Sequence, residues 1–175
     1  VSSICNVIGS TIARFAGNGA YLYAGPEYSV ASTKAFTNMS AVLMLLALTL
    51  SETNNVERAR VIRGLREMPQ RMSSYLHSEI DFESIVELLV DSKTALFIGR
   101  GPNSHISSEA ALKMMEITYL PCIAYPGGEL KHGPIALIEK GTPVIAIAPD
   151  DSHYPKMEAN IRECASRGAN IILVT

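Results

Sequence analysis

The sequence predicts an α/β fold in which doubly wound parallel sheets are flanked by helices. Two features indicate this class. Short apolar runs such as residues 143–148 are hydrophobic throughout instead of alternating, which is typical of strands buried on both faces of a parallel sheet. Segments of about ten to fifteen residues with helical periodicity separate these runs, as the crossover helices of βαβ units do.

The individual elements follow from periodicity and from turn residues. Ser32 or Thr33 is expected to cap a long apolar helix that runs to about residue 50. Pro69 and Asp81 are expected to punctuate the two helical segments that follow it. Strands are predicted at 1–7, 20–23, 94–98, 122–125, 143–148 and 171–174, and helices at 9–14, 33–50, 56–68, 80–89, 104–118, 131–138 and 154–167.

The helical stretch 52–91 is expected to join two α/β parts, residues 1–91 and residues 92–175. No Gly/Ser-rich linker marks the boundary, so its place near residue 92 rests on the start of the next predicted strand. The chain opens on a strand that is already under way and closes on an apolar run. Because domains usually have polar, frayed ends, further functional parts are expected outside these residues.

Composition excludes several classes of protein. Of the 175 residues, 47% are hydrophobic, and the formal net charge is -2 without a run of like charges, so neither a nucleic-acid surface nor a membrane surface is indicated. The apolar stretch 41–50 is too short to span a bilayer. Cys5, Cys122 and Cys164 are scattered, which predicts reduced thiols, no disulfide and no metal site. We expect a cytoplasmic protein without a cofactor.

Three segments are expected beyond the carboxyl ends of the strands, where open parallel sheets bind ligands. The first, GRG at residues 99–101, lacks a dinucleotide-binding spacing and fits a tight turn or a ligand contact equally. The second is the predicted helix with Glu109, Lys113 and Glu116 on one face. These three charges form either a solvated stripe or a base beside a proton donor, the pair that aldose–ketose conversion requires.

The third segment, PGGELKHGP at residues 126–134, combines glycines and prolines with a polar core. Such a loop is expected to be rigid and to present its polar side chains. His132 is either structural or catalytic, and imidazole titrates near neutral pH.

Two stretches resemble a known family. Residues 24–37 read AGPEYSVASTKAFT, and residues 109–119 read EAALKMMEITY, followed by GELKHGPIAL at 128–137. These strings, in this order and spacing, resemble the isomerase domain of glutamine–fructose-6-phosphate amidotransferases, over nearly the whole chain. The GELKHGP string is highly specific within the sugar isomerase (SIS) superfamily.

The resemblance implies a fold and a set of roles. The fold is of SIS type, with the later part of a first subdomain followed by most of a second. Glu116 matches the base that moves a proton between C1 and C2 of the sugar. Lys113 matches the lysine that assists proton transfer at the ring or C5 oxygen. His132 matches the ring-opening histidine, which in this family acts on the neighbouring subunit's site, so a homodimer is implied. Val30 and Ser32 match positions at the sugar pocket.

The chain also departs from the family pattern. The family's Ser/Thr-rich phosphate loop and its glutaminase domain are expected upstream of Val1, and the tail that carries its Schiff-base lysine is expected downstream. Met115 stands where lysine is usual, and Pro126 and Gly127 stand where small residues such as alanine are usual. The fragment alone is therefore expected to be incomplete.

Two other functions remain open from the sequence. One is a SIS-fold sugar-phosphate deaminase or deglycase, which uses a catalytic glutamate without a glutaminase domain. The other is a non-catalytic module that senses a phosphosugar. A sensor needs neither a base at Glu116 nor His132, and both residues stand within full motifs.

Overall fold

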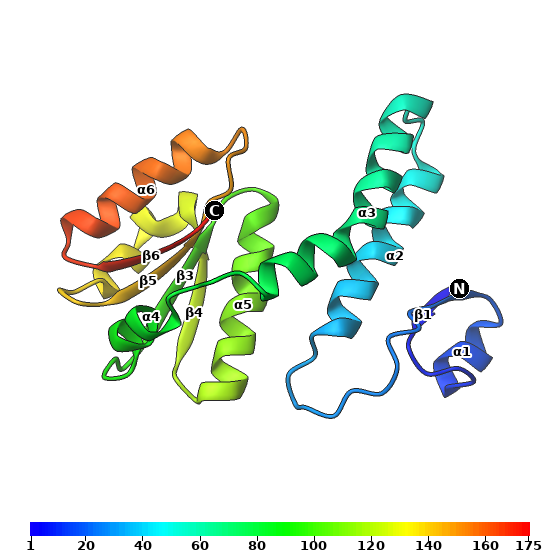
Figure 1. Ribbon diagram of the computed structural model, residues 1–175, viewed down its shortest axis with the longest axis horizontal. Helices are drawn as coiled ribbons and strands as arrows, with labels where there is room; N and C mark the ends of the chain where they lie inside the picture. The colour runs from blue at the N-terminus through cyan, green and yellow to red at the C-terminus, as the bar shows by residue number, and fades with distance from the viewer. The chain divides into compact units, whose positions relative to one another are not determined.

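A four-stranded parallel sheet organises the second half of the chain in the computed structural model, which describes all 175 residues (Figure 1). The chain divides into two compact units, Val1–Glu79 and Ile80–Thr175. The strands of the second unit are β3 (Ala95–Gly99), β4 (Cys122–Pro126), β5 (Pro143–Ile147) and β6 (Asn170–Val174), in the order β4-β3-β5-β6. Since β4 and β5 lie on opposite sides of β3, the sheet is doubly wound, as predicted.

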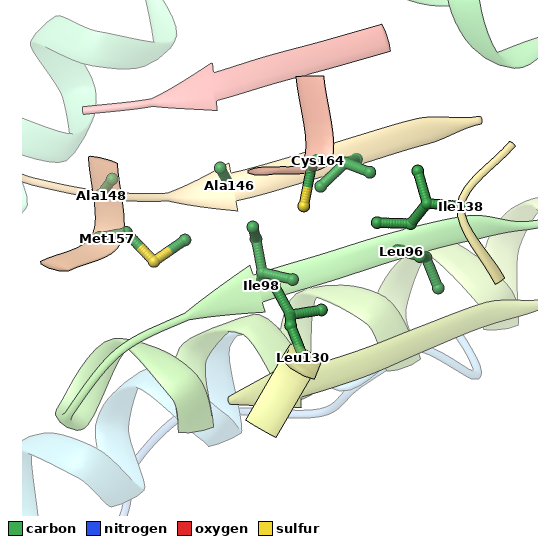
Figure 2. Close-up of a cluster of buried hydrophobic side chains, with 9 residues drawn as sticks. Leu96, Ile98, Leu130, Ile138, Ala146, Ala148, Met157 and Cys164 are labelled. Carbon is green, nitrogen blue, oxygen red and sulfur yellow. The ribbon is translucent and has the colours of Figure 1, made fainter. Parts of the chain in front are cut away.

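Helices cover both faces of this sheet. The helices of the second unit are α4 (Phe82–Leu89), α5 (Pro102–Thr118) and α6 (Tyr154–Ser166), with two 3-10 helices, η1 (Gly127–His132) and η2 (Pro134–Leu137), between β4 and β5. Alternate residues of β3 enter different cores: Leu96 and Ile98 face one side, while Ala95 and Phe97 face the other. Figure 2 shows Leu130 of η1 and Met157 and Cys164 of α6 over the first of these faces.

Helix α4 belongs to the second unit. The Asp81 carboxylate caps it by accepting a hydrogen bond from the Ser84 amide at 3.1 Å. Ile85, Leu88 and Leu89 pack with Ala95 and Phe97 in the core that α5 also covers. The sequence prediction placed the boundary near residue 92 and therefore assigned this helix to residues 1–91. The assignment of residues 1–91 and 92–175 to two subdomains stays a prediction.

The first unit has fewer buried residues. It contains β1 (Ser3–Cys5) and β2 (Gly19–Tyr21), which pair in parallel, with α1 (Thr11–Ala16), α2 (Lys34–Leu50) and α3 (Asn55–Leu76). Leu22 and Ala31 are its buried hydrophobic residues, and much of α2 is half exposed. No helix of the chain combines the length and the hydropathy that a membrane crossing requires.

The expectation that Pro69 ends a helix is wrong, because α3 continues from Asn55 to Leu76 with Pro69 inside it. Proline removes one backbone hydrogen bond from the helix interior, but the residues on either side keep theirs. An ion pair between Glu67 and Arg71, at 2.9 Å, spans the proline one turn apart. Good helix-forming residues around it favour continuation.

The GRG segment at residues 99–101 is a tight strand-to-helix turn. A Cβ atom on Gly99 would lie 2.2 Å from the Asn103 carbonyl oxygen and 2.4 Å from Ser107 Oγ. Gly101 has a φ of 57°, and a Cβ there would lie 2.6 Å from Nε2 of His153. Close packing of α5 and His153 on the turn accounts for both glycines.

We predict that Gly99→Ala destabilises the second unit by about 1–3 kcal/mol, since its new methyl group meets backbone atoms that must move. Gly64→Ala is the matched control, because a Cβ on this residue of α3 meets nothing within 4 Å. It should stabilise α3 by about 0.5–1 kcal/mol. Urea unfolding of both variants tests this, and equal stability of Gly99→Ala and the unchanged chain would contradict the close packing.

Candidate active site

Helix α5 carries a cluster of three charged side chains. Lys113 Nζ donates a hydrogen bond to Glu116 Oε2 at 2.7 Å and lies 3.4 Å from Glu109 Oε1. The three side chains are 20–23% exposed. The three charges are partly shielded from water and contact one another, which favours a paired cluster over a solvated surface stripe.

The electrostatics of this cluster favour a charged lysine. The hydrogen bond to Glu116, with a smaller contribution from Glu109, raises the pKa of Lys113 above its usual 10.5 although desolvation opposes this. A raised pKa in the folded state stabilises the fold at every pH below the ordinary value, and this contribution is lost only as the pH rises through the raised pKa. At neutral pH, Lys113 is therefore a charged ammonium group in contact with Glu109 and Glu116.

The edge at which this cluster lies differs from the expectation. Parallel pairing sets Ala95 opposite Cys122 and Gly99 opposite Pro126, so α5 starts beyond the carboxyl end of β3 and runs back to the start of β4 (Figure 1). Glu116 is in the last turn of α5 and therefore lies toward the amino-terminal edge of the sheet. The prediction that it lies beyond the carboxyl ends of the strands is wrong, because the crossover carries the helix the length of the sheet.

The loop with His132 does lie beyond the carboxyl end of β4, as predicted. It is the 3-10 helix η1, in which Gly127 and Leu130 are buried while Glu129, Lys131 and His132 are exposed. Leu130, with no exposed surface, anchors the loop in the core beside Ile98 (Figure 2). This arrangement explains the sequence: the apolar residue fastens the loop and the polar residues are presented outward.

Val30 and Ser32 lie in the first unit, in the segment between β2 and α2. Val30 is 86% exposed and Ser32 is half-buried. Thr33 is the N-cap residue of α2 but makes no side-chain cap bond. The Glu27 carboxylate instead accepts hydrogen bonds from the amides of Thr33, at 3.3 Å, and Ala35, at 3.2 Å.

Glu27 is thus a structural residue of this loop that the sequence prediction missed. The Ala35 amide, with smaller contributions from the Ser32 hydroxyl and the Thr33 amide, lowers the pKa of Glu27. It remains ionised at neutral pH and fits the positive end of the helix dipole. Its position, six to eight residues before the amides that it caps, lies outside the short spacings that identify caps in a sequence.

Glu109 was expected on the same helix face as Lys113 and Glu116, but the sequence prediction assigned it no role. Its i, i+4 spacing from Lys113 was visible in the sequence, but spacing does not distinguish an exposed pair from a shielded one. Glu109, Lys113 and Glu116 together form the structural unit. A carboxylate that is partly shielded from water, beside an ammonium group, is suited to moving a proton on a bound carbonyl compound.

Comparisons with known proteins agree with this geometry. The SIS domain family model matches residues 88–175. The chain is 43% identical to a glutamine–fructose-6-phosphate aminotransferase [isomerizing] of Chlorobaculum tepidum and 42% identical to one of Legionella pneumophila. These alignments cover 99% and 98% of this chain, and the chain spans 29% and 28% of the length of these relatives.

Solved structures give the same picture. The C-terminal domain of glucosamine-fructose-6-phosphate aminotransferase from Francisella tularensis superposes with a TM-score of 0.93 at 35% identity, over 98% of this chain and 50% of that one. A glucosamine-6-phosphate deaminase from Thermotoga maritima gives a TM-score of 0.74 at 25% identity, over 99% of this chain and 51% of that one.

We predict that Glu116→Gln lowers the pKa of Lys113, because it removes the charged acceptor of the shortest bond in the cluster. Glu109→Gln should lower it less, since Glu109 is 3.4 Å away. NMR titration of the Lys113 side chain in the two variants measures both values. If the pKa of Lys113 falls more in Glu109→Gln than in Glu116→Gln, then Glu109, and not Glu116, is the stronger partner of the ammonium group.

Proposed function

The chain belongs to the SIS domain family, and we propose that it is the sugar-isomerising part of a glutamine–fructose-6-phosphate aminotransferase. The observation that carries the proposal is the shielded Glu109–Lys113–Glu116 cluster, which supplies a base and a proton donor from one helix. Similarity to aminotransferases along nearly the whole chain supports the choice of reaction. A phosphosugar is then the substrate, and ammonia derives from glutamine in a glutaminase region of the complete protein.

The reaction proceeds through ring-opened fructose 6-phosphate. Ammonia condenses with the C2 carbonyl, and water leaves to give an imine. Glu116 takes a proton from C1 and returns it to C2, while the imine nitrogen gains a proton and the C1 hydroxyl loses one, so that the number of protons is conserved. C1 becomes the aldehyde carbon and C2 bears the amine, which gives glucosamine 6-phosphate. No metal or redox group enters this balance.

The charges of the cluster suit this role. Lys113 binds Glu116 through Oε2 and leaves the other carboxylate oxygen free to accept the C1 proton. Its raised pKa keeps the ammonium group charged, so that it can assist proton transfer at the C5 oxygen. Glu109 contacts the same ammonium group and holds it in place when Glu116 becomes protonated.

His132 acts in ring opening, and we place it in the site of a second copy of the chain. The support is topological: Glu116 lies toward the amino-terminal edge of the sheet and His132 beyond the carboxyl end of β4. β4 alone, with five residues, separates these edges by about 16 Å. A closed, symmetric dimer lets each copy complete the other's site.

Val30 and Ser32 are proposed to contact the sugar from the loop that Glu27 fastens to the start of α2. The exposed Val30 side chain contributes an apolar contact, and the Ser32 hydroxyl contributes a hydrogen bond. Both contacts would act in binding, so we assign these residues no step of proton transfer.

A sugar-phosphate deaminase is the second candidate, favoured by the likeness to the Thermotoga maritima glucosamine-6-phosphate deaminase. It uses a base between C1 and C2 as well, but releases ammonia from glucosamine 6-phosphate. Net release of ammonia without any formation of glucosamine 6-phosphate from fructose 6-phosphate and glutamine, in the full-length protein, would favour this function.

We expect the full-length protein to exchange the C2 proton of glucosamine 6-phosphate with D₂O, and Glu116→Gln to slow this exchange by about 10²–10⁴-fold. Ligand binding should persist, since the amide is isosteric. Proton NMR follows the exchange and isothermal titration follows the binding. Equal exchange in both proteins would remove Glu116 from this role, and exchange in neither would favour a phosphosugar sensor.

Mixing two inactive variants tests the site between two copies. If His132 acts in trans, a dimer of one Glu116→Gln chain and one His132→Asn chain contains one intact site. Randomly mixed dimers should then recover about one quarter of the unchanged activity. Refolding the two full-length variants together and separately, with a glucosamine 6-phosphate assay, gives the comparison. No recovery in a demonstrated mixed dimer would mean that His132 acts within its own chain.

A further inference from the structure

A second polar cluster connects α6 to the loop that presents His132. Asn160 of α6 is 5% exposed, and Ser107 is the other buried polar residue of the chain. The Ser107 hydroxyl bonds within its own helix, to the Asn103 carbonyl at 2.8 Å. Asn160 Oδ1 instead accepts a hydrogen bond from Arg100 Nη1 at 2.9 Å, across 60 residues of sequence. A buried amide is costly unless it is paired, so this contact determines how the turn after β3 meets α6.

The start of the loop lies against this pair. A Cβ atom on Gly127 would lie 2.7 Å from Asn160 Oδ1 and 3.2 Å from Met157 Sδ. A Cβ atom on Gly128 would lie 3.5 Å from Arg100 Nη2. The backbone of η1 therefore begins in direct contact with the side chains that Arg100 and Asn160 hold in place.

The end of the loop is fastened to the same helix. Lys131 Nζ lies 2.8 Å from Glu163 Oε1, and Glu163 follows Asn160 by three residues on α6. Lys131, with a smaller contribution from Asn160, lowers the pKa of Glu163, so the carboxylate is charged at neutral pH and this contribution to stability is lost only when the pH falls through the lowered pKa. His132 is the next residue after Lys131.

We propose that Arg100 and Asn160 are positioning residues, which set the direction of the His132 imidazole by fixing the start of η1 against α6. The inference rests on the proposed role of His132 in ring opening. Neither residue is assigned a contact with the sugar; both act through the loop backbone. The Lys131–Glu163 ion pair and the buried Leu130 complete the support, so the loop is held at its start, its middle and its end.

The test compares Asn160→Leu, Arg100→Met and the double variant in the full-length protein. Each single variant should lower kcat by about 10–100-fold with little change in KM, the effect of a displacement of about 1 Å. The double variant should be no slower than the slower single variant, because both changes break the same contact. Asn160→Asp keeps an acceptor oxygen for Arg100 but loses the amide donor to Glu163, so it should recover part of the rate.

Arg162→Met is the matched control on α6. Arg162 pairs with Glu158 on the exposed side of the helix, at 2.6 Å, with 77% of its side chain exposed. The Arg162→Met variant should therefore leave kcat unchanged. A fall in kcat for Arg162→Met equal to that for Asn160→Leu would overturn the proposal, because it would show a general effect of disturbing α6.

A second readout does not depend on activity. Amide hydrogen exchange at residues 127–133 should become faster in Asn160→Leu, and the NMR resonances of the His132 ring should shift, while both stay unchanged in Arg162→Met. If the unchanged protein lacks isomerase activity, the proposed function fails, but these measurements still decide whether the loop depends on Asn160. Unchanged exchange and unchanged His132 resonances in Asn160→Leu would overturn the positioning role.

Discussion

The parallel pairing of β3 with β4 is the constraint on which the rest of the site depends. Parallel neighbours require a connection that returns along the whole sheet, and α5 is that connection. Its start is fixed beyond Gly99 and its end before Cys122, so the charged residues of its last turns lie toward one edge. The loop after β4 lies beyond the opposite, carboxyl-terminal edge of the sheet. A substitution on α5 or in the loop changes the side chains at that edge of the sheet. The topology alone determines at which edge each of the two segments lies.

One face of α5 packs against the sheet, and the charged residues lie on the adjoining face. Ala110, Ala111 and Met114 join the core that Phe97 enters, and the absence of a side chain at Gly99 allows the helix to approach the strand closely. Glu109, Lys113 and Glu116 occupy positions beside this apolar face and are shielded from much of the solvent. Such charges are tolerated when they are paired, and the loss of one partner leaves another uncompensated. The cluster therefore behaves as a unit, in which the pKa of Lys113 depends on both glutamates.

Much of the fold could be predicted from the sequence, because its signals are local. The apolar run at β5 and the periodicity of α5 and α6 reflect burial that each segment shows by itself. The prediction that a helix ends at Pro69 was wrong because the local rule for helix ends does not take the flanking helix-forming residues into account. Glu27 and the shielded state of Glu109 were missed because both depend on distances between residues that spacing does not give. The GELKHGP loop was identified as a site, but its attachment through Arg100 and Asn160 required the register of β3 and β4.

The anchoring of the His132 loop limits how His132 and Glu116 could come together in the proposed site. Leu130 has no exposed surface, Gly127 has no room for a side chain, and Lys131 is paired with Glu163. To carry His132 past β4 to the edge of Glu116, about 16 Å away, the loop would have to withdraw Leu130 from the core and break these contacts. Burial of one leucine side chain alone is worth about 1.5–3 kcal/mol, and the Lys131–Glu163 ion pair would be lost in addition. The rigid attachment of the loop therefore supports the proposal that His132 opens the sugar ring at the site of a second copy of the chain.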